Sequence, residues 1–212
     1  MITAATRRVG VAILGLGTVG TAVAQAIDEQ RDLIAARFDM QIGVTAVLER
    51  ASGRATRANL PPEIVATDLA TILSDDTVDV VVEVLGGERP AADYMERCLR
   101  AGKHILIEKP LATRSQEAMA ILEAGRQAGK IVMAGHTFLY NPAVIAVRDI
   151  IASGEIGKVH YIDSTRVNLG LYQNDINVVW DLAPHDVSIL LFLLNMDPIT
   201  ASARGGMYVK KG

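Results

Sequence analysis

Short apolar segments alternate with longer amphipathic segments over the first two thirds of the chain. The apolar segments have the length of buried strands, and the amphipathic segments repeat their apolar residues with helical spacing. The predicted strands cover residues 9–14, 42–48, 63–68, 78–87, 103–108 and 130–135. The predicted helices cover residues 18–37, 69–75, 89–102 and 115–129. Strands that alternate with helices in this way indicate βαβ units and a doubly wound parallel sheet, an α/β fold.

The pattern changes at about residue 140, where we place a domain boundary. Beyond it, one segment alternates polar and apolar residues as a half-buried antiparallel strand does, and another is a strongly apolar helix. The expected elements are a helix and turn at 143–159, a strand at 160–170, a helix at 181–195 and the start of a strand at 198–206. We therefore expect a first domain over 1–140 and the start of an α+β substrate domain over 141–212.

Composition narrows the class of protein. Half of the residues are hydrophobic and only 4 % are aromatic, so the core is expected to be aliphatic. The net charge is −3 and no run of like charges occurs, which argues against a nucleic-acid or membrane-surface partner. The single cysteine, Cys98, excludes an internal disulfide and fits a cytoplasmic location, and we expect its thiol to be packed in a helix.

A glycine-rich motif, "GLGTVG", stands between the first strand and the first helix. Gly15 allows a tight turn, Gly17 lets a pyrophosphate approach the backbone, and Gly20 packs the helix closely. The first helical turn, with Thr18 and Val19, offers N–H groups and a positive dipole end to the phosphates. A chance glycine-rich turn is the alternative, but the strand–motif–helix context favours a Rossmann-type dinucleotide-binding domain. The four glycines also argue against reading this apolar stretch as a secretory signal.

An acidic residue, Glu49, ends the second predicted strand. It would accept hydrogen bonds from the ribose hydroxyls and repel a 2′-phosphate, which favours NAD as the cofactor. Arg50 leaves NADP possible, because its guanidinium could pair with that phosphate. A solvated pair of charges at a strand end is the alternative.

Polar or flexible residues follow two further strands at the same edge of the sheet, where ligands collect. Gly86 and Gly87 would let the dinucleotide pass close to the backbone, or form a simple turn. Lys109 would lie beside the nicotinamide, where burial and the nicotinium charge would lower its pKa enough for proton transfer. Glu108 could orient the ammonium group or merely face solvent, and the Lys109–Pro110 bond could be cis. A snorkelling surface lysine is the alternative.

A second polar group lies in "WDLAPHD". Asp181 and His185 stand four residues apart, so they share one face of a helix. Proline is tolerated only in a first helical turn, so Pro184 predicts that the helix begins here. Asp181 as an N-cap and His185 as a partly buried polar residue are the alternatives. His136 and Tyr140 are weaker candidates for lining the cleft, and packing is the simpler role for Tyr140.

From about residue 107 the chain resembles the glucose–fructose oxidoreductase/inositol dehydrogenase family, called Gfo/Idh/MocA. The motifs that carry the resemblance are "EKPLA", "GHTFLYNPAV", "SGEIGKVHYIDSTRVNLG" and "WDLAPHD", and the last two are most similar to members that act on sugar nucleotides. The resemblance implies that Lys109, Asp181 and His185 are catalytic and that Asn168, His136 and Tyr140 contribute to substrate binding. It also implies a substrate domain with a large open sheet, so the chain looks truncated and prone to self-association as a homo-oligomer.

The first hundred residues are more similar to the cofactor domain of homoserine dehydrogenase. The similarity is carried by "VAILGLGTVGTAVAQAIDEQRDLIAAR" and "DVVVEVLGGERPAADYMERCLRAGKH". Together the two resemblances imply an NAD(P)-dependent oxidoreductase that acts on a secondary hydroxyl or ketone of a sugar. A nucleotide-linked sugar is the favoured substrate. A homoserine-dehydrogenase-like enzyme and a catalytically incomplete dinucleotide-binding protein are the alternatives. No metal site is expected.

Overall fold

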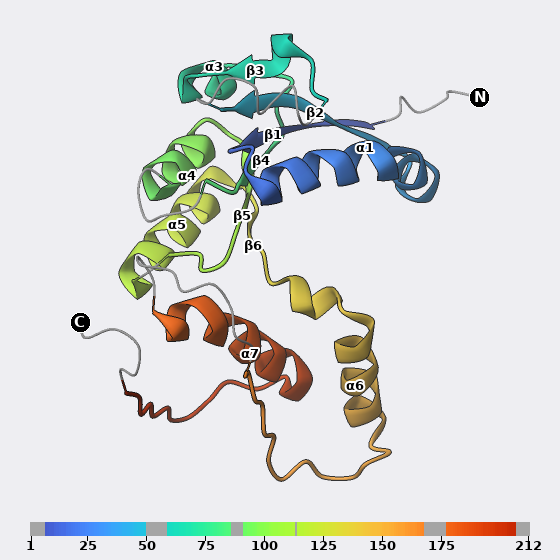
Figure 1. Cartoon of the computed structure of the whole chain (residues 1–212), viewed down its shortest axis with the longest axis vertical. Helices are drawn as coiled ribbons and strands as arrows, with labels where there is room; N and C mark the ends of the chain where they lie inside the picture. The colour runs from blue at the N-terminus through green and yellow to red at the C-terminus, as the bar shows by residue number, and fades with distance from the viewer. Residues whose placement is uncertain (1–6, 50–58, 86–90, 113, 168–176, 207–212) are drawn as a thin grey trace. The chain divides into compact units, whose positions relative to one another are not determined.

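The computed structural model describes residues 7–49, 59–85, 91–112, 114–167 and 177–206 (Figure 1). The chain divides into two compact units. One, here called the sheet unit, comprises Met1–Gly135 and Gln173–Asp181, and the other, the helical unit, comprises His136–Tyr172 and Leu182–Gly212. Helix α7 (Val178–Leu194) contributes its first turn to the sheet unit and its remainder to the helical unit.

The sheet unit is built on six strands that pair in parallel in the order β3-β2-β1-β4-β5-β6. The strands are β1 (Arg7–Leu14), β2 (Met40–Leu48), β3 (Val65–Ala66), β4 (Val80–Glu83), β5 (His104–Ile107) and β6 (Val132–Ala134). The direction of winding reverses between β1 and β4, which is the arrangement of the doubly wound dinucleotide-binding sheet. The predicted α/β fold class is therefore confirmed, and each of the six predicted strands is present: β1 and β2 begin two residues earlier than predicted, and the other four strands are shorter.

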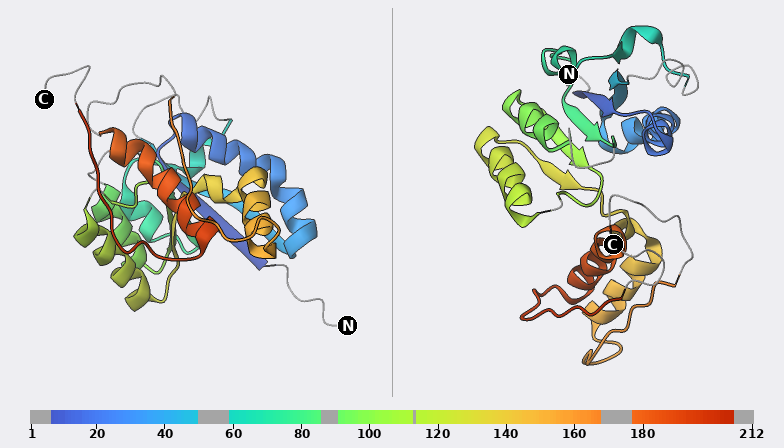
Figure 2. Two further views of the ribbon diagram at one scale, coloured as in Figure 1. Left: turned by 90° about the horizontal axis from the view of Figure 1, so that it is seen from below. Right: turned by 60° about the vertical axis from the view of Figure 1, so that its left-hand side comes forward.

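Helices cover both faces of this sheet. Along β1, Val11 and Ile13 face one core and Ala12 and Leu14 face the other, and each of these side chains is almost fully buried. Helix α1 (Thr18–Phe38) packs on the first face through Ala24. The second face is covered by α3 (Leu69–Leu73), α4 (Ala91–Arg100) and α5 (Ser115–Ala128). Figures 1 and 2 show α1 on the side of the sheet opposite to α4 and α5.

The lone cysteine lies in the second of these cores. Cys98 of α4 is fully buried and free, as expected of a packed thiol. Burial raises the pKa of its thiol to about 12, so the thiolate that would act as a nucleophile is not formed near neutral pH.

The helical unit contains a short 3₁₀ helix (Thr137–Tyr140), α6 (Pro142–Ser153) and most of α7. The guanidinium of Arg148 on α6 lies 4.8 Å from the ring centroid of Phe192 on α7, so the two helices pack together. The strands expected at 160–170 and 198–206 are not formed in their described parts, residues 160–167 and 198–206. The prediction was wrong because alternation identifies a strand only where a neighbour supplies hydrogen bonds, and no described segment of this unit pairs with either one.

No helix among the described residues is long and apolar enough to cross a membrane.

Candidate active site

The glycine-rich loop joins β1 to α1 at the carboxyl edge of the sheet. Gly15 has a φ of +98°, a conformation that favours glycine, and its N–H donates to the carbonyl of Leu48 at 3.0 Å. A Cβ on Gly20 would lie 1.9 Å from the carbonyl oxygen of Gly15, so only glycine fits where helix meets loop. These are the turn and the close packing that the motif predicts for the two residues.

The start of α1 fits a dinucleotide pyrophosphate. Gly17 is the N-cap residue, and no side chain among the described residues caps this helix end, so its first N–H groups remain available to a ligand. A Cβ on Gly17 would meet nothing within 4 Å, which leaves open space directly above the backbone. Thr18 and Val19, in the first turn, are exposed. Free N–H groups, the helix dipole and open space are what a phosphate group needs.

Glu49 lies at the end of β2, where it was predicted to meet the ribose. Its side chain is buried, and its Oε2 accepts a hydrogen bond from the N–H of Leu16 at 3.0 Å. The carboxyl group therefore braces the glycine-rich loop from the β2 side, a role that the position in the motif did not indicate. Its contact with a ribose stays a prediction.

A second buried carboxyl group, Glu83, ends β4. Its Oε1 accepts from the N–H of Leu85 at 2.7 Å. Burial raises the pKa of Glu83, and the nearby Glu108 raises it further, against the lowering effect of the Leu85 hydrogen bond. Sequence reasoning missed this residue because "VVVEVL" was read as one buried strand, although a lone acidic residue within such a strand is itself a signal.

Lys109 follows β5 at the same edge, after Glu108, and the Lys109–Pro110 peptide bond is cis. The lysine side chain is only 13 % exposed, which excludes a snorkelling surface role. Its Nζ donates to the backbone carbonyl of Asp181 at 2.6 Å and to Asp181 Oδ1 at 3.1 Å. Glu108, one candidate for orienting the ammonium group, makes no hydrogen bond or ion pair with it among the described residues. Two predicted catalytic residues, separated by 72 positions, are thus in direct contact.

Asp181 is held in place by the start of α7. The side chain of Asn177 accepts from the N–H groups of Val179 and Trp180 at 3.0 and 3.1 Å, so Asn177 is the helix cap. The expectation that the helix begins at about Asp181, with Pro184 in its first turn and Asp181 as a possible N-cap, is therefore wrong. The helix starts at Val178, and Pro184 lies inside it, where it removes one helical hydrogen bond without ending the helix.

His185 lies on the same helix, four residues after Asp181, and belongs to the helical unit. Its ring contacts the ring of Phe138 edge-on, with centroids 4.8 Å apart. The other partner of Phe138 is Arg166, whose guanidinium lies 5.0 Å from the ring centroid. Sequence reasoning gave Phe138 and Arg166 no role, because an aromatic residue and a surface cation have no local signature.

Asp186 fixes Arg166 in that position. The Nε of Arg166 donates to Asp186 Oδ2 at 2.6 Å, and Ser164 Oγ donates to Oδ1 at 2.8 Å. Burial alone would raise the pKa of the Asp186 carboxyl, but the hydrogen bonds from Arg166 and Ser164 lower it overall. The carboxylate is therefore ionised beside His185, in a cluster formed entirely within the helical unit.

Of the remaining predicted site residues, two are described by the structure and four are not. His136 immediately precedes the 3₁₀ helix, and its buried Nδ1 has no hydrogen-bond partner among the described residues, whereas Tyr140 is 66 % exposed. Four predicted site residues lie outside the described residues: Arg50, Gly86, Gly87 and Asn168.

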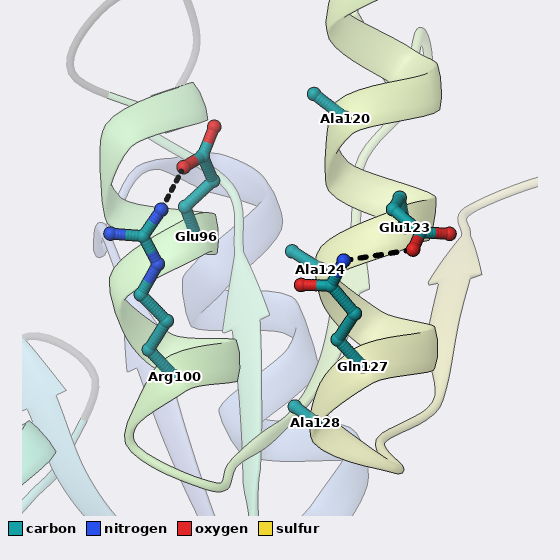
Figure 3. Close-up of a pocket in the computed structure, with 7 residues that line it drawn as sticks. All are labelled: Glu96, Arg100, Ala120, Glu123, Ala124, Gln127 and Ala128. Atoms are coloured by element: carbon teal, nitrogen blue, oxygen red, sulfur yellow. Dashed lines mark hydrogen bonds and ion pairs between the residues drawn. The ribbon is translucent and has the colours of Figure 1, made fainter.

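A groove of about 490 Å³ lies elsewhere, on the outer surface of α4 and α5 (Figure 3). It is lined by Glu96, Arg100, Ala120, Glu123, Ala124, Gln127 and Ala128. Its polar groups are engaged with one another, through the Glu96–Arg100 ion pair and the hydrogen bond from Gln127 to Glu123. None of the predicted site residues lines it, and we assign it no role. No cluster of three or more His, Cys, Asp or Glu residues suited to a metal ion occurs in the described parts of the chain.

Comparison with known proteins identifies a family and two related enzymes. Residues 9–136 match the family model described as "Oxidoreductase family, NAD-binding Rossmann fold". The chain is 31 % identical over 165 residues to inositol 2-dehydrogenase 2 of Saccharopolyspora erythraea, an alignment that covers 76 % of this chain and 48 % of that protein. It is 30 % identical over 115 residues to homoserine dehydrogenase of Bacillus subtilis, covering 54 % of this chain and 25 % of that one.

A solved structure shows the same architecture. The NAD-binding oxidoreductase of Klebsiella pneumoniae superimposes with a TM-score of 0.72 at 25 % identity, over 88 % of this chain and 53 % of that one. The chain therefore spans about half the length of the inositol dehydrogenase and of this oxidoreductase. Both similarities predicted from the sequence, and the nicotinamide cofactor, are confirmed. The family match begins at residue 9, however, and not at about residue 107 as the sequence motifs indicated.

Proposed function

The chain belongs to the Gfo/Idh/MocA family of oxidoreductases, and from this we propose that it is an NAD(P)-dependent dehydrogenase of a secondary alcohol. The proposed substrate is a sugar or cyclic polyol, which is oxidised at a hydroxyl-bearing carbon or regenerated from the ketone. The observation that supports this most directly is the contact between the buried Lys109 and Asp181. Because Lys109 follows β5, this contact lies at the carboxyl edge of the sheet, where dinucleotides bind in this fold.

Each charged residue has a distinct role in the proposed reaction. A nicotinamide dinucleotide held by the glycine-rich loop would supply the acceptor for the hydride that leaves the carbinol carbon. His185 takes the proton of the substrate hydroxyl, and the ammonium group of Lys109 donates a hydrogen bond to the same oxygen as negative charge develops there. Asp181 holds the lysine Nζ through two hydrogen bonds, which fixes the direction of the third N–H. Asp181 also remains our candidate for orienting the His185 imidazole.

Several finer features belong to the same proposal. The "WDLAPHD" segment favours a nucleotide-linked sugar, with Asn168, His136 and Tyr140 near the substrate. Glu49 favours NAD over NADP, with Arg50, Gly86, Gly87 and Glu108 as further cofactor contacts. We also expect a homo-oligomer in the cytoplasm, and no nucleic-acid or membrane partner.

The similarity to homoserine dehydrogenase over the cofactor-binding part supports a second candidate, reduction of a small amino-acid aldehyde. A substrate panel distinguishes the two candidates. Reduction of NAD⁺ would be followed at 340 nm with inositols, free sugars, nucleotide-linked sugars and homoserine, each at the same concentration. We expect turnover with a cyclic polyol or sugar and none with homoserine. Turnover with homoserine alone would replace the first proposal by the second, and NAD⁺ binding without any turnover would support a catalytically incomplete protein.

A further inference from the structure

Glu83 is a buried charged residue that the proposed reaction does not use. It ends β4, one of the two central strands of the sheet, and its side chain is 5 % exposed. Its neighbours in the register are Leu14 of β1 and Ile107 of β5, both apolar and buried. A carboxyl group is seldom retained at such a position without a specific partner, because its removal from water is unfavourable.

The partner is the backbone of the turn that follows β4. Glu83 Oε1 accepts from the N–H of Leu85 at 2.7 Å, and the N–H of Val84 donates to the carbonyl of Leu14 at 3.1 Å. These two bonds fix the direction in which the chain leaves the sheet. They therefore fix residues 84–85, which lead towards Gly86 and Gly87.

The Val84–Leu85 turn also packs against the glycine-rich loop. A Cβ on Gly15 would lie 3.1 Å from the carbonyl oxygen of Val84 and 3.2 Å from a methyl group of Leu85. A Cβ on Gly20 would lie 3.2 Å from a methyl group of Val84. The loop and the turn are thus in close contact, and a shift of the Val84–Leu85 backbone would displace the loop.

Two buried carboxyl groups therefore support the loop, each through one backbone N–H. Glu49 binds the N–H of Leu16 within the loop, and Glu83 binds that of Leu85 in the neighbouring turn. The burial that raises the pKa of Glu83 favours its uncharged form, which still accepts a hydrogen bond through Oε1. A glutamine, which is uncharged and has the same shape, could accept the same bond.

We propose that Glu83 is a positioning residue for the dinucleotide: its carboxyl group fixes the Val84–Leu85 turn, and this turn holds the glycine-rich loop in the conformation that binds the pyrophosphate. The proposal depends on dinucleotide binding by the sheet unit and not on the sugar substrate. It is therefore tested by binding alone, and the absence of turnover with any alcohol would leave it unaffected.

The test compares the substitution by methionine at two buried residues, Glu83 at the end of β4 and Lys103 just before β5. Lys103 directly precedes β5, so it lies at the opposite edge of the sheet from Glu83. It is 6 % exposed, and its Nζ donates to the carbonyl of Asp75 at 2.7 Å. The affinity for NAD⁺ would be measured by calorimetry, without alcohol substrate, for the unmodified chain, Glu83→Met, Glu83→Gln and Lys103→Met. We expect Glu83→Met to weaken binding about tenfold or more, and Glu83→Gln to restore it to within about threefold. Lys103→Met should leave the affinity unchanged even where it lowers the melting temperature.

Three results would overturn the proposal: normal NAD⁺ affinity in Glu83→Met, equal weakening in Glu83→Gln, or equal weakening in Lys103→Met. An unmodified chain that does not bind NAD⁺ would also overturn it. If Glu83→Met does not fold, the proposal is tested by hydrogen exchange of the backbone amides in the unmodified chain. The amide of Leu85 should then exchange slowly and become slower still with NAD⁺, whereas exchange at the rate of an exposed loop amide would contradict the proposal.

Discussion

The sheet unit and the helical unit differ in how completely their side chains are buried. In the sheet unit, residues such as Ile13, Leu99 and Ile105 are at most 1 % exposed. In the described part of the helical unit the only buried side chain is that of Ser188, and Ile199 is 96 % exposed. The comparison shows where a hydrophobic pattern determines structure. The short apolar segments of the sheet unit pair with one another and form strands, whereas the alternating segment at 160–167, which has no paired neighbour among the described residues, remains irregular.

The candidate chemistry follows the same division. The sheet unit contains the glycine-rich loop, two buried carboxyl groups at strand ends, and the contact between Lys109, which follows β5, and Asp181, in the first turn of α7. His185 belongs to the helical unit, where its described ring contact is to Phe138. We therefore expect cofactor binding to depend on the sheet unit alone, and turnover to depend on residues of both units.

Replacing the lysine should give the largest effect. Lys109→Met removes the group that we propose polarises the substrate oxygen, so turnover with the best alcohol should fall about 100- to 10,000-fold. Affinity for NAD⁺ should stay nearly unchanged, because the Lys109 Nζ binds Asp181 and no residue of the glycine-rich loop. Turnover by absorbance and affinity by calorimetry would be measured on one sample.

Lys130→Met is the matched control, because Lys130 lies two residues before β6, at the opposite edge of the sheet. It should retain turnover. Near-normal turnover in Lys109→Met would remove the assigned catalytic role.

Core substitutions should separate the two units in stability. Ile105→Ala in β5 removes a fully packed side chain and should lower the free energy of unfolding by about 2–5 kcal/mol. Ile199→Ala removes an exposed one and should change it by about 0.5 kcal/mol or less. Urea unfolding followed by circular dichroism measures both. Equal effects of the two substitutions would show that Ile199 is buried in solution.

The sequence predicted the sheet unit well because its signals are local. The spacing of Gly15, Gly17 and Gly20 needs only a strand before it and a helix after it, and Lys109 is marked by the end of a strand. The Lys109–Asp181 contact could not be derived from spacing, since the two residues are 72 positions apart and only the tertiary fold brings them together. The start of α7 was misplaced because Pro184 was given more weight than the Asn177 cap. Phe138 and Arg166 were missed because their contacts are also purely tertiary.

The preference for NAD over NADP should depend on the charge of Glu49. Glu49→Gln keeps an oxygen that can accept from the N–H of Leu16 but removes the charge that we propose repels a 2′-phosphate. The ratio of NADP⁺ to NAD⁺ affinity should therefore rise about tenfold. Glu63→Gln removes an exposed carboxylate before β3 and should leave the ratio unchanged. Tighter binding of NADP⁺ than of NAD⁺ by the unmodified chain would contradict the assigned preference.

The smallest expected effect is a pH dependence. The pKa of Glu83 is raised by burial above its ordinary value of 4.5, so the folded state holds this proton more tightly than the unfolded state. Its contribution to stability is therefore fully present below the ordinary value and is lost as pH rises through the raised one. Glu83→Gln lacks this proton, so the stability of the variant relative to the unmodified chain should increase with pH above the ordinary value. Urea unfolding at a series of pH values measures the difference, and a constant difference would show that Glu83 has an unshifted pKa.

The most direct test of the central claim is a crystal structure of the chain soaked with NAD⁺. We expect the pyrophosphate at the N-terminus of α1 above Gly17, the adenosine ribose near Glu49 and the nicotinamide beside Lys109. A dinucleotide bound elsewhere, such as in the groove between α4 and α5, or bound with its nicotinamide away from Lys109, would contradict the assignment of the carboxyl edge of the sheet as the site of hydride transfer.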